Sequence, residues 1–387
     1  MSIYPEDFGA AGDGATIDTA AIQSALDNCA EKGGGRVVLE KKYLSGALRI
    51  GRNTQLHLAE NAVLKASGEL EDYIQPGVID DDSNRGIGTP VTRKPAFVFL
   101  YANGAHNVAI TGTGTIDGGG SAFMYRKNQY YCTGHFYPRP TLVYIENCRG
   151  LTVRDVTMTN ASFWTLHPAG CRDVIIDNIK ILNSLDWANS DGIDPDHCQN
   201  VRITNCRIEC ADDCICLKNT AGNSEYPHTR GVHISGCTLV STSAAIKIGT
   251  EGVADFEDIL VENCVISGSN RGISIQLRDC GSLRRAVFRN IKIETRFFTP
   301  DFWGSAEPIA VTAFDRDQHT RVGTVEDVRF ENIDAVGENV ILLRAERKDL
   351  LGEVVFENVN VKLVKTSKWG RREHDLRPGW NIGGSEK

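Results

Sequence analysis

One short phrase recurs along the chain from about residue 105: alternating apolar and polar residues, then Asn, Asp or Gly, then an apolar residue. Two copies read Val153-Arg154-Asp155-Val156 and Phe330-Glu331-Asn332-Ile333. The Asn-type position falls at residues 155, 178, 205, 236, 263, 290, 332 and 358, so the steps are 23, 27, 31, 27, 27, 42 and 26 residues. A repeat of this kind constrains the fold strongly, because each unit must stack on the next to bury its apolar face.

The repeat consists of short β-branched runs with no helical period between them, and steps near 25 residues are too short for strand–helix–strand units. The pattern predicts an all-β fold, a single-stranded right-handed parallel β-helix in which each strand pairs with its equivalent about 4.8 Å away in the next coil. The recurring Asn tolerates the left-handed conformation and can bond to its copies above and below. A β-sandwich with chance spacing is the alternative, and eight copies of one phrase argue against it.

The chain ends differ from this repeat. Residues 1–45 are expected to form an N-terminal cap, with a helix that begins at Asp18-Thr19, buries Ala21, Ile22, Ala25, Leu26 and Cys29, and stops at Gly33-Gly34-Gly35. Residues 46–365 would form the coils of a single domain spanning 1–387, and 366–387 a polar tail that lies along the outside or is mobile. Three stretches interrupt the rhythm and are expected to build a groove on one face: 70–95, 118–140 and 295–308.

The net charge limits the partners. The 387 residues include 42 Lys+Arg and 50 Asp+Glu, giving 42 − 50 = −8, which argues against nucleic acid or an anionic membrane as the main partner. The first residues lack a basic stretch followed by an apolar one, and no 18-residue apolar run occurs. We therefore expect a cytoplasmic protein, with an export signal removed beforehand as the alternative. No pattern specifies an oligomeric state.

Twelve cysteines are too many to ignore and too few for a disulfide scaffold of this size. Several accompany the recurring turn, and four crowd into one coil at 206, 210, 214 and 216. Their spacing matches no standard zinc pattern, so we interpret them as small buried side chains inside a narrow solenoid, which also favours a reducing compartment. No cofactor or metal is predicted.

Two neighbouring coils carry a high density of carboxylates. Asp191 and Asp213 are 22 residues apart, close to one coil, and Asp212 precedes the second of them. Three carboxylates on adjacent coils would raise at least one pKa and place a protonated acid beside an ionised base. Glycoside hydrolysis requires that pair, and room for a water between them predicts inversion. Solvated turn aspartates and a calcium site are the alternatives.

Several motifs make the chain resemble glycoside hydrolase family 28, the polygalacturonase and rhamnogalacturonase group of the pectin-acting β-helix superfamily. The similarity covers about residues 5–360. It begins with Asp7-Phe8-Gly9-Ala10-Ala11-Gly12-Asp13-Gly14 and continues through Gly114-Thr115-Ile116-Asp117-Gly118, Arg139-Pro140 and Phe163-Trp164-Thr165-Leu166-His167. Asn189-Ser190-Asp191 matches the family's Asn-Thr-Asp motif, and Asp212-Asp213 its Asp-Asp motif.

The resemblance implies a role for each matching residue. Asp212 would be the general acid, Asp191 and Asp213 would hold and activate the water, and Asn189 and Asp194 would support them. It also implies a carbohydrate substrate, a pectin-type poly- or oligosaccharide such as a rhamnogalacturonide.

Two family motifs are altered in this chain. The Gly-His-Gly motif falls near Ser243-Ala244-Ala245, and the Arg-Ile-Lys motif that grips a galacturonate carboxylate falls on Ser274-Ile275-Gln276. We therefore expect an atypical −1/+1 subsite, in which nearby cations hold a carboxylate from another angle or the sugars are neutral. The candidate substrate-binding residues are Asn189, Asp194, Lys218, Lys247, Arg271, Gln276, Arg278 and Trp303, and His135, His167 and His197 are candidate substitutes for the missing His.

Two other functions fit the same fold. A polysaccharide lyase would use a carboxylate-bound Ca²⁺ and a base such as Lys247 or Arg271 to abstract the proton α to a uronate. A non-catalytic carbohydrate-binding β-helix would bind glycans without turnover.

Overall fold

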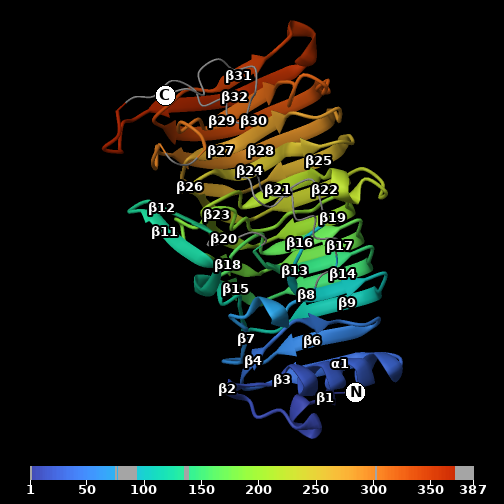
Figure 1. Ribbon diagram of the computed structural model, residues 1–387. Coiled ribbons are helices and arrows are strands. Elements are labelled where there is room, and N and C mark those ends of the chain that lie inside the picture. The colour runs from blue at the N-terminus through green and yellow to red at the C-terminus, as the bar shows by residue number, and fades with distance from the viewer. Residues whose placement is uncertain (1, 75, 77–93, 135–138, 301–302, 371–387) are drawn as a thin grey trace.

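The computed structural model describes residues 2–74, 76, 94–134, 139–300 and 303–370 as a column of stacked coils (Figure 1). The chain climbs from the N-terminal end to the C-terminal end, and nearly all strand pairs are parallel. This confirms the predicted right-handed parallel β-helix. The stacked pairing follows from the repeat, since equivalent apolar residues of successive coils meet in the same row.

One large sheet forms two faces of each coil. In most coils it contributes two strands separated by a short bend, and in β28 and β30 the two strands run on as one. Its strands are β1 Ser2–Ile3, β2 Asp13–Ile17, β3 Gly35–Leu39, β4 Lys42–Ser45, β6 Thr54–Leu58, β7 Val63–Ala66, β9 His106–Thr111, β10 Thr115–Asp117, β14 Arg149–Arg154, β15 Thr157–Thr159, β17 Arg172–Asp177, β18 Lys180–Leu182, β19 Gln199–Thr204, β20 Arg207–Cys210, β22 Arg230–Ser235, β23 Thr238–Ser241, β25 Phe256–Glu262, β26 Val265–Ser269, β28 Leu283–Thr295, β30 Val325–Gly337 and β32 Val354–Leu363.

The third face of the coils consists of two shorter sheets in line. The first contains β5 Leu48–Arg49, β8 Val98–Asn103, β13 Thr141–Glu146 and β16 Leu166–Ala169, and the second β21 Ile215–Asn219, β24 Ala244–Gly252, β27 Arg271–Leu277, β29 Ile309–Ala313 and β31 Leu342–Ala345. Between them, single bridges at Ile193 and Asp196 continue the pairing from β16 to β21. The acidic stretch 189–197 therefore lies where this face is least regular.

All eight predicted turn positions have a left-handed backbone, with φ between 51° and 68°. Asn residues favour this conformation, and the turn separates the two faces that the large sheet contributes. The amide ladder is only partly continuous: Asn358 donates to Asn332 (2.9 Å) and Asn332 to Asn290 (3.2 Å), whereas Gly236 has no side chain to take part.

Replacing Asn332 by Ala is expected to lower the free energy of unfolding by about 1–2 kcal/mol, because Ala is strained at positive φ and both ladder bonds are lost. Asn332→Gly is the matched control, since it loses the same bonds but accepts the φ of 53°. Urea unfolding of both variants measures the difference. Equal losses for Ala and Gly would contradict the role assigned to the backbone.

The interior contains rows of aliphatic, aromatic and thiol side chains. Phe288, Phe330 and Phe356 stack face to face in successive coils, with ring centroids 5.1 and 4.9 Å apart. All twelve cysteines are free, and eleven of them are buried. The interpretation of cysteine as an inward-facing filler is confirmed for eight residues in the core of the coils, while Cys216 lies outside that core and Cys280 is exposed: the eight are Cys148, Cys171, Cys198, Cys206, Cys210, Cys214, Cys237 and Cys264.

The N-terminal helix α1, Thr19–Glu31, covers the first coil and buries Ile22, Ala25, Leu26 and Cys29, as predicted, while Ala21 is half-buried. Asp18 precedes the helix, but its carboxylate accepts from the backbone N–H groups of Ala11 and Gly12. Residues 1–45 also contribute β1 to β4 to the sheet. No helix of the described residues is long and apolar enough to cross a membrane.

The described part of the C-terminal tail returns to the side of the column. Trp369 packs edge-on against Tyr130 (5.3 Å), at the tip of the hairpin β11 Met124–Asn128 and β12 Tyr131–Gly134 within the 118–140 interruption. Figure 1 shows this hairpin projecting from the column. The remaining elements are short 3₁₀ turns: η1 Pro5–Phe8, η2 Leu70–Asp72, η3 Gly120–Phe123, η4 Ala221–Asn223 and η5 Lys348–Leu350.

Candidate active site

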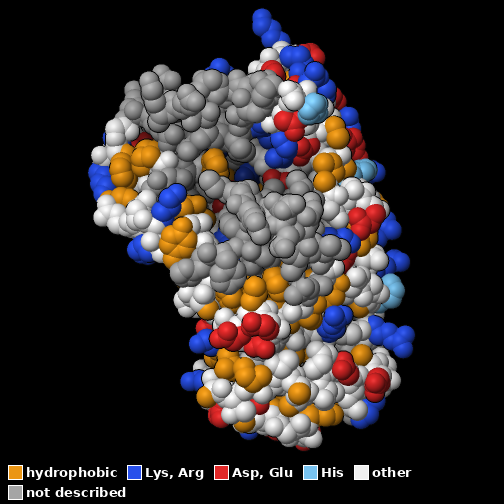
Figure 2. Space-filling view, viewed as in Figure 1, with side chains coloured by type: hydrophobic (Ala, Val, Ile, Leu, Met, Phe, Trp, Pro, Cys, Tyr) orange, Lys and Arg blue, Asp and Glu red, His pale blue; other side chains and the backbone are white. Residues whose placement is uncertain are grey.

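The three predicted catalytic carboxylates meet on the third face of the coils. Asp191 lies in the irregular stretch before the bridge at Ile193, and Asp212 and Asp213 lie in the next coil, two to three residues before β21. One oxygen from each carboxylate lies within 4.8 Å of the others, and all three residues are at least 94% buried. Charged side chains of both signs gather in a recess on the face seen in Figure 2.

Asp213 is held by three donors. Lys247 Nζ in β24 lies 2.8 Å from its Oδ2, and Oδ1 accepts from Ser243 Oγ (3.0 Å) and the Ala244 N–H (3.2 Å). Together these three contacts fix the orientation of the carboxylate. Asp213 is therefore suited to act as a base.

Asp212 has a weaker set of contacts. Its Oδ2 accepts from the backbone N–H of Asn189 (3.2 Å), with the Asn189 amide Nδ2 at 3.5 Å. Burial and the charge of Asp213 raise the pKa of Asp212 to about 6, against the opposing effect of Lys247. A carboxyl group with this pKa remains protonated at mildly acidic pH, as a general acid must.

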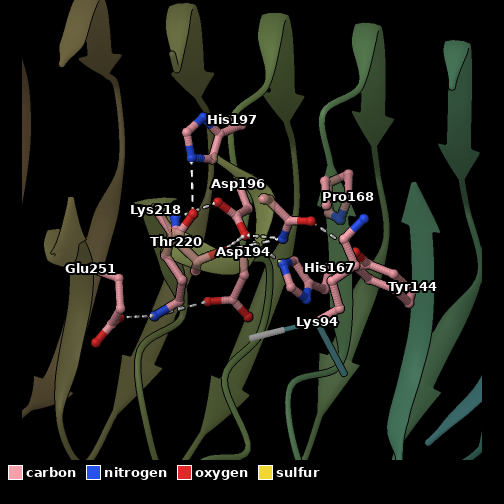
Figure 3. A network of polar contacts seen from close by, with 12 residues as sticks. Lys94, Tyr144, His167, Pro168, Asp194, Asp196, His197, Lys218, Thr220 and Glu251 are labelled. Atoms are coloured by element: carbon pink, nitrogen blue, oxygen red, sulfur yellow. Dashed lines mark hydrogen bonds and ion pairs between the residues drawn. The ribbon is translucent and has the colours of Figure 1, made fainter. Parts of the chain in front are cut away.

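Asp191 and Asp194 flank a buried lysine. Lys218 Nζ in β21 lies 3.2 Å from Glu251, 3.7 Å from Asp194 and 3.9 Å from Asp191, and 4.3 Å from the centre of the Trp164 ring. Figure 3 shows Lys218 between Glu251 and Asp194. This buried ammonium is the counter-charge for three carboxylates, and it is only 3% exposed.

Burial is the main cause of the altered pKa values around Lys218. It raises the pKa of Asp191, with the charge of Asp212 adding to the effect, and it raises the pKa of Asp194 despite the opposing charge of Lys218. Both carboxylates have a buried oxygen with no hydrogen-bond partner among the described residues. Asp213, by contrast, has partners on both oxygens: Lys247 at Oδ2, and Ser243 Oγ and the Ala244 N–H at Oδ1.

A histidine–aspartate pair adjoins this network. His167 Nε2 lies 3.1 Å from Asp196 Oδ2, and the same carboxylate accepts from Thr220 Oγ1 (2.6 Å) and Asn223 Nδ2 (2.8 Å). Burial opposes ionisation of Asp196, but the bonds from His167 and Thr220 outweigh it and lower its pKa to about 2. His197 instead lies near backbone carbonyls, and His135 is outside the described residues.

Two of the predicted substrate-binding cations, Arg271 and Arg278, contact other groups of the protein and not the three acids. Arg271 pairs with Glu307 (3.1 Å) and is 2% exposed, and Arg278 donates to the backbone carbonyls of Phe314 and Asp315. Lys247 remains beside the carboxylate cluster, paired with Asp213.

The two remaining candidates differ in exposure. Gln276 lies buried in β27, opposite Thr312 of β29, while Trp303 is 38% exposed in the 295–308 interruption. The structure thus places Asn189, Asp194, Lys218 and Lys247 next to the three acids, and Arg271 and Arg278 in separate contacts.

Three residues of the site were not predicted. Glu251 gave no sequence signal, because its position depends on the register shift between β21 and β24. Asp196 follows Asp194 by two residues, and that strand-like spacing indicates that both side chains point to one face. Arg139 donates to Asn189 Oδ1 (2.7 Å) from 50 residues away, a contact that only tertiary structure creates.

The three acids are the one group of His, Cys, Asp and Glu side chains, within the described ranges, whose ligand atoms lie close enough to hold a metal ion. Carboxylate oxygens suit Ca²⁺ or Mg²⁺. Lys247 and Lys218 already supply positive charge to two of these acids.

The sequence is similar to a known enzyme family. A family model described as Glycosyl hydrolases family 28 matches residues 88–371. A probable polygalacturonase of Vitis vinifera is 32% identical over 281 residues, which cover 70% of this chain and 56% of that relative. An endo-polygalacturonase of Pectobacterium carotovorum subsp. carotovorum is 24% identical over 371 residues, 91% of this chain and 85% of the relative.

The fold is also similar to that of a solved enzyme. The crystal structure of a hyperthermoactive exopolygalacturonase from Thermotoga maritima superimposes with a TM-score of 0.69 at 20% identity, over 93% of this chain and 91% of that one. At this identity the similarity shows the fold alone.

Proposed function

The chain belongs to glycosyl hydrolases family 28, and from that premise we propose that it is an inverting, polygalacturonase-type hydrolase of pectin-type poly- or oligosaccharides. The observation that carries the proposal is the cluster of Asp191, Asp212 and Asp213, with their oxygens within 4.8 Å. It combines Asp212, whose pKa is raised to about 6, with Asp213, which pairs with Lys247.

The proposed reaction uses the three acids in different roles. Asp212 gives its proton to the glycosidic oxygen as the bond to the anomeric carbon breaks. Asp213 takes a proton from a water molecule, whose oxygen forms the new bond to that carbon on the opposite face of the ring. Asp191 orients this water. One proton leaves Asp212 and one reaches Asp213, so the net change is hydrolysis of one glycosidic bond.

The separation of the acids differs from the usual rule. In inverting enzymes with two carboxyl groups these are about 6.5–9.5 Å apart, and in retaining enzymes about 5–5.5 Å. In this site three carboxylates have oxygens within 4.8 Å of one another, which is closer than either separation. The proposed inversion therefore depends on a water molecule shared by Asp191 and Asp213. A carboxylate nucleophile is less suited to this site, since both oxygens of Asp213 already accept hydrogen bonds or pair with Lys247.

An atypical −1/+1 subsite is part of the proposal. Ser274 and Gln276 stand where the family resemblance places Arg and Lys, and the neighbouring Lys247 is paired with Asp213. Gripping a uronate carboxylate would require Lys247 to share its charge between two anions. This arrangement favours a neutral sugar next to the scissile bond.

The direct test is reducing-sugar release from polygalacturonate and from rhamnogalacturonan oligosaccharides, with the product anomer followed by ¹H NMR. Release of the inverted anomer supports the proposal, and the retained anomer would contradict the mechanism. The carboxylate cluster also fits a calcium-dependent lyase. That reaction would produce an unsaturated uronate with ultraviolet absorbance and would be lost in EDTA.

The pH profile should reflect Asp212. A general acid works only while protonated, so kcat/KM should fall tenfold per pH unit above a midpoint near the pKa of about 6. Well below this pKa Asp212 is protonated and no longer limits kcat/KM. A rate that still increases between pH 6 and pH 8 would contradict the assignment of Asp212 as the acid.

A further inference from the structure

Arg139 is buried near the catalytic carboxylates and hydrogen-bonds to two loops. It is 3% exposed, and its Nη1 donates to the carbonyls of Ser162 (2.8 Å) and Ala188 (2.6 Å). Its Nη2 donates to Asn189 Oδ1 at 2.7 Å. The planar guanidinium can hold several acceptors in fixed directions, which a lysine cannot do.

The contact with Asn189 determines how that residue faces the acid. Because Arg139 occupies the amide oxygen of Asn189, the Nδ2 end lies toward Asp212 Oδ2, at 3.5 Å. Asn189 also has a left-handed backbone, with φ of 60°, and its N–H donates to the same oxygen at 3.2 Å. Both donors that reach Asp212 thus come from a residue held by Arg139.

A second path of contacts leads from Arg139 to the buried lysine. The guanidinium lies 5.2 Å from the centre of the Phe163 ring, and Phe163 stacks on Trp164 with a 5.3 Å separation and an angle of 14°. Trp164 in turn lies 4.3 Å from Lys218 Nζ, which neighbours Asp191 and Asp194. Arg139 is therefore packed against supports of both the acid and its neighbouring carboxylates.

We propose that Arg139 is a positioning residue that acts through Asn189 to hold Asp212 in its proton-donating geometry. This inference rests on the proposed function, because it assigns Asp212 the role of the general acid. Arg139 itself lies one residue away from the reacting groups and does not touch the acid.

Loosening Asn189 weakens the hydrogen bonds that favour the ionised form of Asp212. The pKa of the acid should then rise, and the alkaline limb of kcat/KM should move upward by roughly one pH unit. Misplacement of the acid should also lower kcat roughly 10- to 100-fold.

The test compares Arg139→Lys, Asn189→Gly and the double variant. Arg139→Lys keeps the positive charge but loses the planar guanidinium with its several donors. Asn189→Gly keeps the backbone donor and the positive φ but removes the side chain to which Arg139 donates. Arg149→Lys is the matched control, since this arginine pairs with Asp173 on the outer surface at 67% exposure. The measurements are kcat, kcat/KM against pH, and Tm.

If Arg139 acts through Asn189, each single variant moves the alkaline limb upward and the double variant moves it no further than Asn189→Gly alone. Variants with a lower Tm and an unmoved limb would assign Arg139 a purely structural role and overturn the inference. A wild-type protein that hydrolyses no pectic glycan would overturn the proposed function and the inference together.

Discussion

Replacing Asp212 by Asn is expected to lower kcat by on the order of 10³-fold, because a positioned general acid contributes about 10²- to 10⁴-fold. The amide has nearly the same shape but cannot donate a proton to the leaving oxygen. Asp212 is 6% exposed and makes few bonds, so the variant should keep the wild-type fold and Tm. Single-turnover hydrolysis and thermal unfolding together measure the two effects.

Asp155→Asn is the matched control for this substitution. Asp155 lies at a turn of the solenoid with φ of 66°, where Asn is the common residue, and it accepts a bond from Asn178. The control should leave kcat unchanged. Near-normal turnover in Asp212→Asn would remove Asp212 from the role of the acid.

Lys218→Met is expected to have the largest effect on stability. It leaves Glu251 buried without the lysine that lies 3.2 Å away and removes the positive charge beside Asp194 and Asp191, and breaking a buried ion pair of this kind costs about 3–5 kcal/mol. Catalysis should also fall, because Lys218 opposes the rise that burial causes in the pKa of Asp191, and its removal changes the protonation of that acid. Urea unfolding at several pH values measures the loss.

The pH dependence of this loss follows from Glu251. Burial opposes its ionisation, but Lys218 and Arg316 lower its pKa from 4.5 to about 2. A carboxylate with a depressed pKa stabilises the folded state above its unfolded pKa, and this stabilisation disappears as the pH falls toward the folded value. The deficit of Lys218→Met should therefore be complete at pH 7 and shrink from about pH 4.5 downward.

Lys180→Met, on the exposed side of β18, is the control for removal of a lysine. It should change the free energy of unfolding by less than about 0.5 kcal/mol. A Lys218→Met protein as stable as the wild type at pH 7 would contradict the assignment of Lys218 as the shared counter-charge.

Regular features of the fold could be predicted because they depend on residues repeated in sequence. Residues 155, 178 and 205 each occupy a turn with a left-handed backbone. Because each is about one coil after the previous one, they lie next to one another in the stack. The proximity of Asp191 and Asp213 follows from the same spacing. The positions of Asn189 and Asp194 near the site could also be predicted, since both lie within three residues of Asp191.

Contacts between irregular segments could not be predicted in this way. Lys218 and Arg271 look alike in sequence as cations near the acids, yet one lies among three carboxylates and the other pairs with Glu307. The difference depends on which face each residue occupies and on the course of the loops. Arg139 reaches Asn189, two coils further along the chain, only because the coils are stacked.

The coil, its left-handed turns and the meeting of three acids could be predicted from the residues alone, because these features depend on short-range alternation and a constant step. The environment of each acid comes from the tertiary structure. It consists of burial and of the neighbours of each carboxylate: Lys247, Ser243 and a backbone N–H around Asp213, and only the donors of Asn189 at Asp212. Electrostatic energies depend on distances in space and on exclusion of water, and neither is encoded by residue spacing alone.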